Sequence, residues 1–278
     1  MHAAFVDIDG IKTRYLYAGD GPGLLVVHPV GLLADCFHRN IDALAEDFSV
    51  FVPDLIGHGF TAAPDLSGEP PQKQFVSHLQ AFAEHVGLST YAVMGSSLGG
   101  LLAALLYRAD PDRINGLVII GSGSTFHPTD DFVRTMKATA ANGTKAMQNP
   151  TLASCRMRIE KICFDSGVID DGLLTIQLTS YALPDRLEAY QAILSGLVDY
   201  ADDPDLRVYD GLEEILTPTL VIQGREDIRS KLVHTQTGIA RMPKARLTVY
   251  NECGHLPFYE QPQRFNSDVT AFLNSERG

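Results

Sequence analysis

The sequence predicts an α/β fold in which a mostly parallel central sheet carries helices on both faces. Short apolar runs alternate along the chain with longer stretches of helical periodicity, which is typical of parallel strands joined by helices. Some of the runs are apolar at every position, as expected of strands covered on both faces. The strand-like runs are residues 24–27, 49–52, 91–94, 117–120, 220–222 and 247–250, and the helical stretches between and after them include residues 41–46, 75–86, 98–108, 232–240 and 265–273.

Two segments depart from this alternation. Residues 4–8 and 11–18 predict a hairpin joined at Asp9-Gly10, a dipeptide that favours a tight turn. Residues 125–212 predict helices with no strand between them, at 132–141, 152–163, 172–183 and 187–197. A helical insertion between two strands is the natural form of a lid over an active site. We therefore expect a core of residues 1–124 and 213–278, with a helical lid of residues 125–212 inserted after the sixth strand.

The composition limits the partners of the protein. The 278 residues carry a formal net charge of −12, which disfavours binding to the phosphates of a nucleic acid. No apolar run reaches the roughly 18 residues that span a bilayer, and the first residues do not resemble a secretion signal. The four cysteines form no C-x-x-C pair, which favours reduced thiols in a cytoplasm. We expect a small-molecule substrate and neither a nucleic-acid nor a membrane partner, and we leave a homo-oligomer open.

The segment Gly95-Ser96-Ser97-Leu98-Gly99 predicts a nucleophile. It follows an apolar strand and opens a helix, which is the context of a G-x-S-x-G nucleophile elbow. The tight turn presents the serine hydroxyl at the carboxyl edge of the sheet, and a side chain at either flanking glycine would collide with neighbouring backbone. The N-terminus of the following helix favours developing negative charge. Ser97 is therefore the candidate nucleophile, and the alternative is a glycine-rich turn with an incidental serine.

An elbow serine requires an acid and then a histidine later in the chain. Asp227 follows the strand-like run 220–222, and its neighbour Glu226 is the rival acid. His255 follows the run 247–250. Because the three segments occur in the required order and each follows a strand, we expect a catalytic triad in which His255 is the general base and Asp227 orients it.

An oxyanion hole requires two backbone N–H groups. One belongs to Leu98, the residue after the nucleophile, and the other to the loop after the third strand, residues 28–32. Val30 is the candidate in that loop, because Pro29 has no N–H to donate. We expect His28 to brace this loop and His58 to support a turn, and neither to take part in catalysis.

These segments together resemble the α/β-hydrolase superfamily over nearly the whole chain. Within it, the chain is similar to the meta-cleavage-product hydrolases of aromatic degradation, which split a carbon–carbon bond in a vinylogous diketone acid. The similarity is carried by residues 97–100, 164–174, 224–227 and 253–255. The resemblance implies the α/β-hydrolase fold and serine hydrolase chemistry.

Four positions depart from that family. Ser96 replaces a usual asparagine, Leu256 replaces a usual tryptophan, and Pro29 and Val30 lie in a loop that is usually glycine-rich. Gln177 falls where a lid arginine binds the substrate carboxylate, and a glutamine cannot replace that bidentate, charge-assisted contact. We therefore expect Gln177 to line the acyl pocket and the substrate to be uncharged there. If the substrate is anionic, Arg156 or Arg158 of the lid becomes the expected anchor.

The sequence shows no metal-ligand spacing, phosphate-binding loop or dinucleotide fingerprint, so we expect no metal and no cofactor. It predicts a serine hydrolase that cleaves a small carboxylic ester or lactone through an acyl-enzyme. The alternative is carbon–carbon bond hydrolysis of a vinylogous diketone acid. A more distant alternative is a ligand receptor on the same fold that does not catalyse a reaction.

Overall fold

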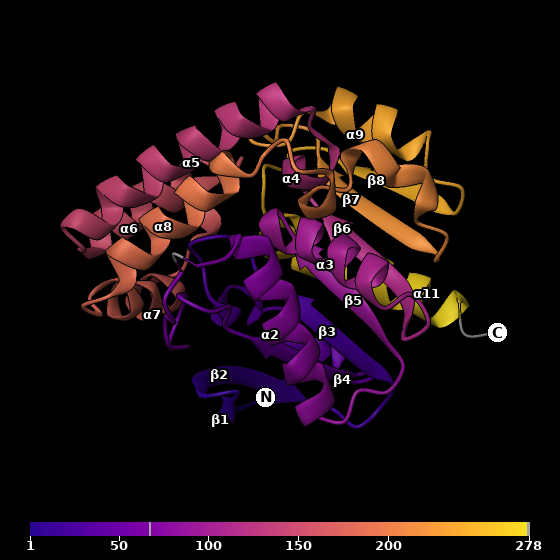
Figure 1. Ribbon diagram of the computed structural model, residues 1–278, viewed down its shortest axis with the longest axis horizontal. Helices are drawn as coiled ribbons and strands as arrows, with labels where there is room; N and C mark the ends of the chain where they lie inside the picture. Colours follow the sequence, from indigo (N-terminus) through magenta and orange to yellow (C-terminus); the bar gives the residue numbers. More distant parts are fainter. Residues whose placement is uncertain (67, 277–278) are drawn as a thin grey trace.

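A computed structural model describes residues 1–66 and 68–276, and within them one eight-stranded sheet forms the centre of the molecule (Figure 1). The strand order is β1-β2-β4-β3-β5-β6-β7-β8. The pairs β1–β2 and β2–β4 are antiparallel and all the others are parallel, which confirms the predicted, mostly parallel sheet. The strands are β1 (His2–Ile8), β2 (Ile11–Ala18), β3 (Gly23–Val27), β4 (Ser49–Pro53), β5 (Tyr91–Ser96), β6 (Ile114–Ile120), β7 (Thr219–Gly224) and β8 (Ala245–Tyr250).

Helices pack on both faces of this sheet. Gly100 of α3 lies against Ile119 of β6, whereas Leu273 of α11 lies at Gly116 of the same strand. Because side chains alternate between the two faces of a strand, positions 116 and 119 face opposite sides, and so do the two helices. The helices outside the β6–β7 connection are α1 (Ile41–Leu44), α2 (Pro71–His85), α3 (Leu98–Ala109), α9 (Leu232–Ile239), α10 (Pro257–Glu260) and α11 (Pro262–Ser275).

The predicted hairpin is present at the start of the chain. Asp9 and Gly10 have φ angles of 50° and 84°, and Ile8 pairs with Ile11 across the two-residue turn. Positive φ at both central positions is the geometry that asparagine, aspartate and glycine tolerate best. The Gly10 N–H donates to Asp7 Oδ1 at 2.8 Å, so the side chain before the turn also stabilises it.

The connection from β6 to β7 is helical, as the sequence predicts. It contains α4 (Gly123–Phe126), α5 (Thr129–Gln148), α6 (Leu152–Glu160), α7 (Asp171–Tyr181) and α8 (Arg186–Asp199), with short 3₁₀ turns at Ser166–Val168, Pro204–Leu206 and Tyr209–Glu214. Figure 1 shows α5, α6, α7 and α8 gathered beyond one side of the sheet. Helix α5 (Thr129–Gln148) is longer than the predicted 132–141 at both ends. Asp130 and Asp131 in its first turn favour the earlier start. The division into core and lid at residues 124 and 213 stays a prediction.

A buried ionic cluster ties the turn after β4 to the loop after β3. Asp54 is fully buried and accepts from the N–H groups of Ala34 and Phe60 at 2.7 and 2.9 Å. Arg14 of β2 donates to the same carboxylate at 3.3 Å and also pairs with Asp35 in the 3₁₀ turn Ala34–Phe37. The cluster therefore fixes the distance between two loops that meet at the carboxyl edge of the sheet.

His28 adds a second tie at this edge. Its Nε2 accepts from the Leu55 N–H at 2.9 Å, and its Nδ1 therefore carries the proton and donates to the Pro29 carbonyl at 2.8 Å. Complete burial lowers the pKa of His28, which keeps the ring neutral in this arrangement. The structure thus confirms the bracing position that the sequence suggested.

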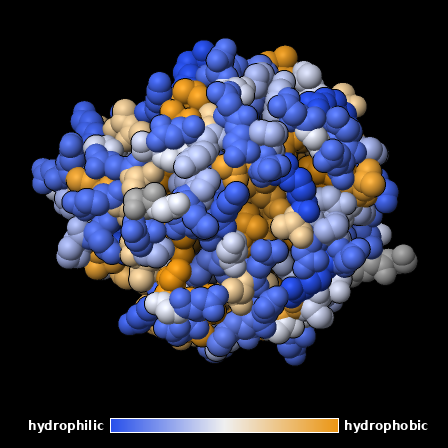
Figure 2. Space-filling view, viewed as in Figure 1, coloured by the Kyte–Doolittle hydropathy of each residue, from blue (hydrophilic) through white to orange (hydrophobic). Residues whose placement is uncertain are grey.

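The visible surface is mostly hydrophilic, with small and separate hydrophobic patches (Figure 2). Among the described residues, no helix combines the length and apolar character needed to cross a membrane.

We predict that Asp54→Ala lowers the free energy of unfolding by about 3–5 kcal/mol, because it leaves a buried arginine, a buried N–H group and a half-buried N–H group without this acceptor. Chemical denaturation followed by circular dichroism measures the change. Asp42→Ala is the control, since Asp42 is exposed and pairs with the N-terminal amine on the surface. Equal stability of the two variants would contradict a stabilising role for the cluster.

Candidate active site

Ser97 occupies the strained turn between β5 and α3. Its φ and ψ are 55° and −114°, a conformation that L-residues rarely adopt. A Cβ at Gly95 would collide with the Gly99 carbonyl, and a Cβ at Gly99 would collide with the Val27 carbonyl. The turn is held from β6, because the Ser97 N–H donates to the Ile120 carbonyl at 2.9 Å. The glycine spacing in the sequence therefore reflects a close approach of three backbone segments.

His255 and Asp227 meet at the ends of β8 and β7. His255 Nδ1 lies 2.8 Å from Asp227 Oδ2, and the Asp227 side chain is fully buried. The carboxylate also accepts from the N–H groups of Arg229 and Ser230 at 2.7 and 3.0 Å and from Gln223 Nε2 at 3.2 Å. These contacts fix the carboxylate, which in turn orients the imidazole and leaves Nε2 for the nucleophile.

Glu226, the rival acid, has a different partner. Its Oε2 accepts from the Cys253 N–H at 2.9 Å and so joins the two loops through backbone. The loops also touch directly, because a Cβ at Gly224 would collide with the Gly254 carbonyl. The geometry favours Asp227 as the orienting group, while the catalytic role of each triad member stays a prediction.

Two backbone N–H groups near Ser97 have no acceptor in the part of the chain that the structure describes. Neither Leu98, at the start of α3, nor Val30 donates a hydrogen bond to any residue in the described part of the chain. The carbonyl of the preceding Pro29 is held by His28 Nδ1 and by the Leu32 N–H at 3.2 Å. Since the N–H of a trans peptide points away from its carbonyl, this contact directs the Val30 N–H away from His28. Both groups therefore remain available for a developing oxyanion.

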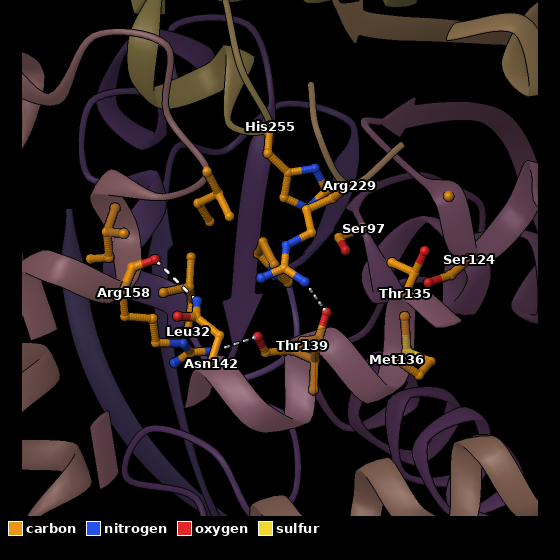
Figure 3. A pocket seen from close by; sticks show the side chains of 15 residues that line it. Leu32, Ser97, Ser124, Thr135, Met136, Thr139, Asn142, Arg158, Arg229 and His255 are labelled. Atoms are coloured by element: carbon orange, nitrogen blue, oxygen red, sulfur yellow. Dashed lines mark hydrogen bonds between the residues drawn. The ribbon is translucent and has the colours of Figure 1, made fainter. Parts of the chain in front are cut away.

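Ser97 and His255 line one pocket together with apolar and polar side chains (Figure 3). The apolar residues of the lining include Val30, Leu32, Met136, Ile159 and Ile162. Among its polar residues, Thr135, Thr139 and Asn142 lie in α5. Ser124 also lines the pocket, and its buried hydroxyl has no partner among the described residues. The pocket can therefore hold a substrate with an apolar part and a polar part.

Arg229 also lines this pocket, although the sequence did not predict it there. Its guanidinium points into the pocket beside Ser97 and donates to Thr139 Oγ1 at 3.1 Å (Figure 3). No carboxylate in the described ranges forms an ion pair with it. Burial lowers the pKa of Arg229, but an arginine stays cationic at neutral pH. The sequence offered one indication, which is the position of this arginine two residues after the predicted acid.

The lid residues named from the sequence lie in three different places. Arg158 of α6 lines the pocket, whereas Arg156 pairs with Asp171 at 2.9 Å on the exposed side of the lid. Gln177 does not line the pocket: it is buried in α7, and neither of its amide atoms has a partner among the residues described. The expectation that Gln177 lines the acyl pocket is therefore wrong. The pocket contains the cationic side chains of Arg158 and Arg229 instead of a neutral amide from Gln177.

Comparison with known proteins identifies the family. The alpha/beta hydrolase family matches residues 24–268. The chain belongs to this family. It is 29% identical to a 2-hydroxymuconate semialdehyde hydrolase of Pseudomonas putida, over 95% of this chain and 91% of the relative. It is also 29% identical to a 2-hydroxy-6-oxononadienedioate/2-hydroxy-6-oxononatrienedioate hydrolase of Burkholderia vietnamiensis, over 95% and 92% of the two chains.

Solved structures of hydrolases share the fold of this alpha/beta hydrolase. A meta-cleavage product hydrolase from Pseudomonas fluorescens superposes with a TM-score of 0.83 at 24% identity, over 98% of this chain and 97% of that one. A thermophilic esterase from Thermogutta terrifontis superposes with a TM-score of 0.79 at 21% identity, over the full length of both chains. At these identities the likeness establishes the fold and leaves the substrate open.

We predict that Ser97→Ala lowers kcat by several orders of magnitude, toward the roughly 10⁶-fold loss of triad variants, without altering the fold. The hydroxyl is the one group of the turn that the substitution removes. Labelling by a sulfonyl fluoride, located by mass spectrometry of the intact protein and its peptides, should occur at Ser97 in the wild type and disappear in the variant. Full activity of the alanine variant would disprove Ser97 as the nucleophile.

We predict that Asp227→Asn lowers kcat by about 10⁴-fold, because an amide favours the wrong tautomer of His255. Glu226→Gln is the matched control, since its carboxylate contacts backbone and not the imidazole. Steady-state rates of the two variants, measured side by side, decide between the two acids. A larger loss in Glu226→Gln would transfer the role to Glu226.

Proposed function

We propose that this enzyme hydrolyses a carbon–carbon bond beside the ketone of a vinylogous diketone acid. The observation that carries the proposal is Arg229, a cation without an ion-pair partner in the described residues, in the pocket that contains Ser97 and His255. The names of two relatives support it, because one is a hydrolase of 2-hydroxymuconate semialdehyde and the other of 2-hydroxy-6-oxononadienedioate and 2-hydroxy-6-oxononatrienedioate. Of the two functions expected from the sequence, the carbon–carbon alternative thus has more support than ester or lactone hydrolysis.

The chemistry needs only the groups already placed at the site. Ser97 attacks the ketone carbon while His255 takes its proton, and the oxyanion lies at the N–H groups of Leu98 and Val30. When the carbon–carbon bond breaks, its electron pair is delocalised by conjugation onto the second carbonyl, which takes the proton from His255. Water then attacks the acyl-enzyme with His255 as base and releases a carboxylic acid and the free serine.

The carboxylate of such a substrate lies next to that second carbonyl, where negative charge develops during bond cleavage. A guanidinium in the pocket binds the carboxylate and stabilises the added charge. Arg229 is suited to this role because no acidic side chain within the described residues forms an ion pair with it and Thr139 fixes one of its nitrogens. A neutral ester has no carboxylate for this contact, so Arg229 favours hydrolysis of the diketone acid over hydrolysis of the ester.

We predict that the wild type has a higher kcat/KM for a ring-cleavage diketone acid than for p-nitrophenyl acetate. Arg229→Met should lower kcat/KM for the acid by about 10- to 150-fold, the equivalent of losing a charged hydrogen bond of 1.5–3 kcal/mol. The variant should change the value for the neutral ester by less than about threefold, the scale of a minor packing change. Both substrates are followed by absorbance under steady-state conditions.

Gln177→Met is the control for this prediction, since it alters a buried side chain that does not line the pocket. It should leave the ratio of the two kcat/KM values unchanged. If the wild type hydrolyses neutral esters or lactones much faster than any diketone acid, the proposal is wrong and the enzyme is an esterase. If it hydrolyses neither while Ser97 still reacts with a sulfonyl fluoride, the substrate belongs to another class of acyl compound.

A further inference from the structure

The lid holds the loop that carries the Val30 N–H. Arg158 of α6 donates from Nη1 to the Gly31 carbonyl at 2.5 Å and from Nη2 to the Val30 carbonyl at 3.3 Å. Tyr181 of α7 donates its hydroxyl to the same Gly31 carbonyl at 2.6 Å. Three donors from two lid helices therefore bind two successive carbonyls of the loop. On its other side, the loop is held by the contact of His28 with the Pro29 carbonyl at 2.8 Å.

The loop and Arg158 are shaped to each other. Gly31 has a φ of 71°, and a Cβ at this position would collide with the Arg158 guanidinium and lie 2.7 Å from the Tyr190 ring. The absence of a side chain at Gly31 thus allows the guanidinium to reach the backbone. Arg158 is 7% exposed and lies 5.4 Å from the ring centroids of both Tyr181 and Tyr190.

The charge of Arg158 is not neutralised by a carboxylate within the described residues. Carbonyl oxygens and aromatic faces surround the cation instead, and these groups stabilise it without cancelling its charge. A buried charge in a region of low dielectric acts strongly on its neighbours. The nearest neighbour of the Arg158 guanidinium is the loop that carries the Val30 N–H.

We propose that Arg158, assisted by Tyr181, is a positioning residue for the oxyanion hole. It fixes the Val30–Gly31 segment so that the Val30 N–H is directed at the reacting oxygen, and its positive charge favours the oxyanion. This inference rests on Ser97 as the nucleophile and is independent of whether the bond cleaved is carbon–carbon or ester. It differs from an anchoring role for Arg158, in which the side chain binds a substrate carboxylate and leaves neutral substrates unaffected.

A neutral alkyl fluorophosphonate tests the proposal without knowledge of the natural substrate. Attack by Ser97 displaces fluoride and forms a phosphonyl ester, whose phosphoryl oxygen occupies the oxyanion position. The second-order rate constant of inactivation should fall by about 10- to 100-fold in Arg158→Met, somewhat less than for loss of a direct oxyanion donor. Arg158→Lys keeps the charge and should recover part of the rate, and Tyr181→Phe should lose about three- to tenfold.

Steady-state constants for p-nitrophenyl acetate provide the second readout. Positioning of the oxyanion hole predicts a lower kcat with a KM within about threefold of the wild type, because the contact acts in the transition state. Arg156→Met is the matched control, since Arg156 lies two residues away on the same helix and forms an exposed ion pair. It should retain the wild-type rate constants, and thermal unfolding of all variants verifies that they are folded.

Two results would overturn the proposal. In the first, Arg158→Met is inactivated as fast as Arg156→Met. In the second, the only change is a higher KM for anionic substrates, which would make Arg158 a carboxylate anchor. If Arg158→Met does not fold, Arg158→Lys and Tyr181→Phe decide together, because wild-type inactivation of both variants excludes the role of the lid hydrogen bonds. Failure of the wild type to react at Ser97 would remove the nucleophile and this inference together, whereas a preference for esters would leave the inference intact.

Discussion

The close approach of three backbone segments at Ser97 is the constraint on which the site depends. The end of β5, the start of α3 and the end of β3 touch there, because Gly95 and Gly99 have no side chains to separate them. The contact of Gly99 with the end of β3 brings the loop that follows β3 to the N-terminus of α3. Ser97 and the N–H groups of Leu98 and Val30 are thereby brought together by backbone contacts, while His28 and Arg158 hold the loop from its two sides. The φ of 55° at Ser97 is the strain that this arrangement costs. The parallel sheet adds His255 and Asp227, since β7 and β8 end at the same edge.

This part of the site could be predicted from the sequence because each of its features is local. A glycine at a close approach, a short apolar run and an acid directly after a strand are all readable within a few residues. Ser97, Asp227 and His255 each follow a parallel strand, and parallel strands end at the same edge of the sheet, so the three residues are expected to meet there. The choice between Asp227 and Glu226 needed the structure, because two neighbouring carboxylates differ only in the direction of their side chains. One contacts the imidazole and the other contacts the Cys253 N–H.

The lid could not be placed in the same way. Its helices were predicted approximately, but the face that each presents to the pocket depends on packing between distant segments. In α7, the residues Leu173, Leu174, Gln177, Ser180 and Tyr181 are buried and share one side of the helix. That spacing indicates that this face of α7 packs against the rest of the protein, but it does not identify the segment that it contacts. In the structure the face contacts the carbonyls of Gly59 and Gly31 instead of the pocket. Arg229 was missed for the opposite reason, because no motif surrounds it and only the direction of its side chain makes it part of the site.

Both arginines of the pocket contact one helix, α5. Thr139 of α5 accepts from Arg229 at 3.1 Å, and Asn142, one turn further along, donates to the Arg158 carbonyl at 3.3 Å. A displacement of α5 therefore shifts the Arg229 cation in the pocket and the segment that carries the Arg158 guanidinium. In a protein with a net charge of −12, the overall field repels anionic substrates, so attraction has to come from cations inside the pocket. Arg158 in α6 and Arg229 in the loop after β7 both contact α5, so the positions of the two cations depend on the packing of that one helix.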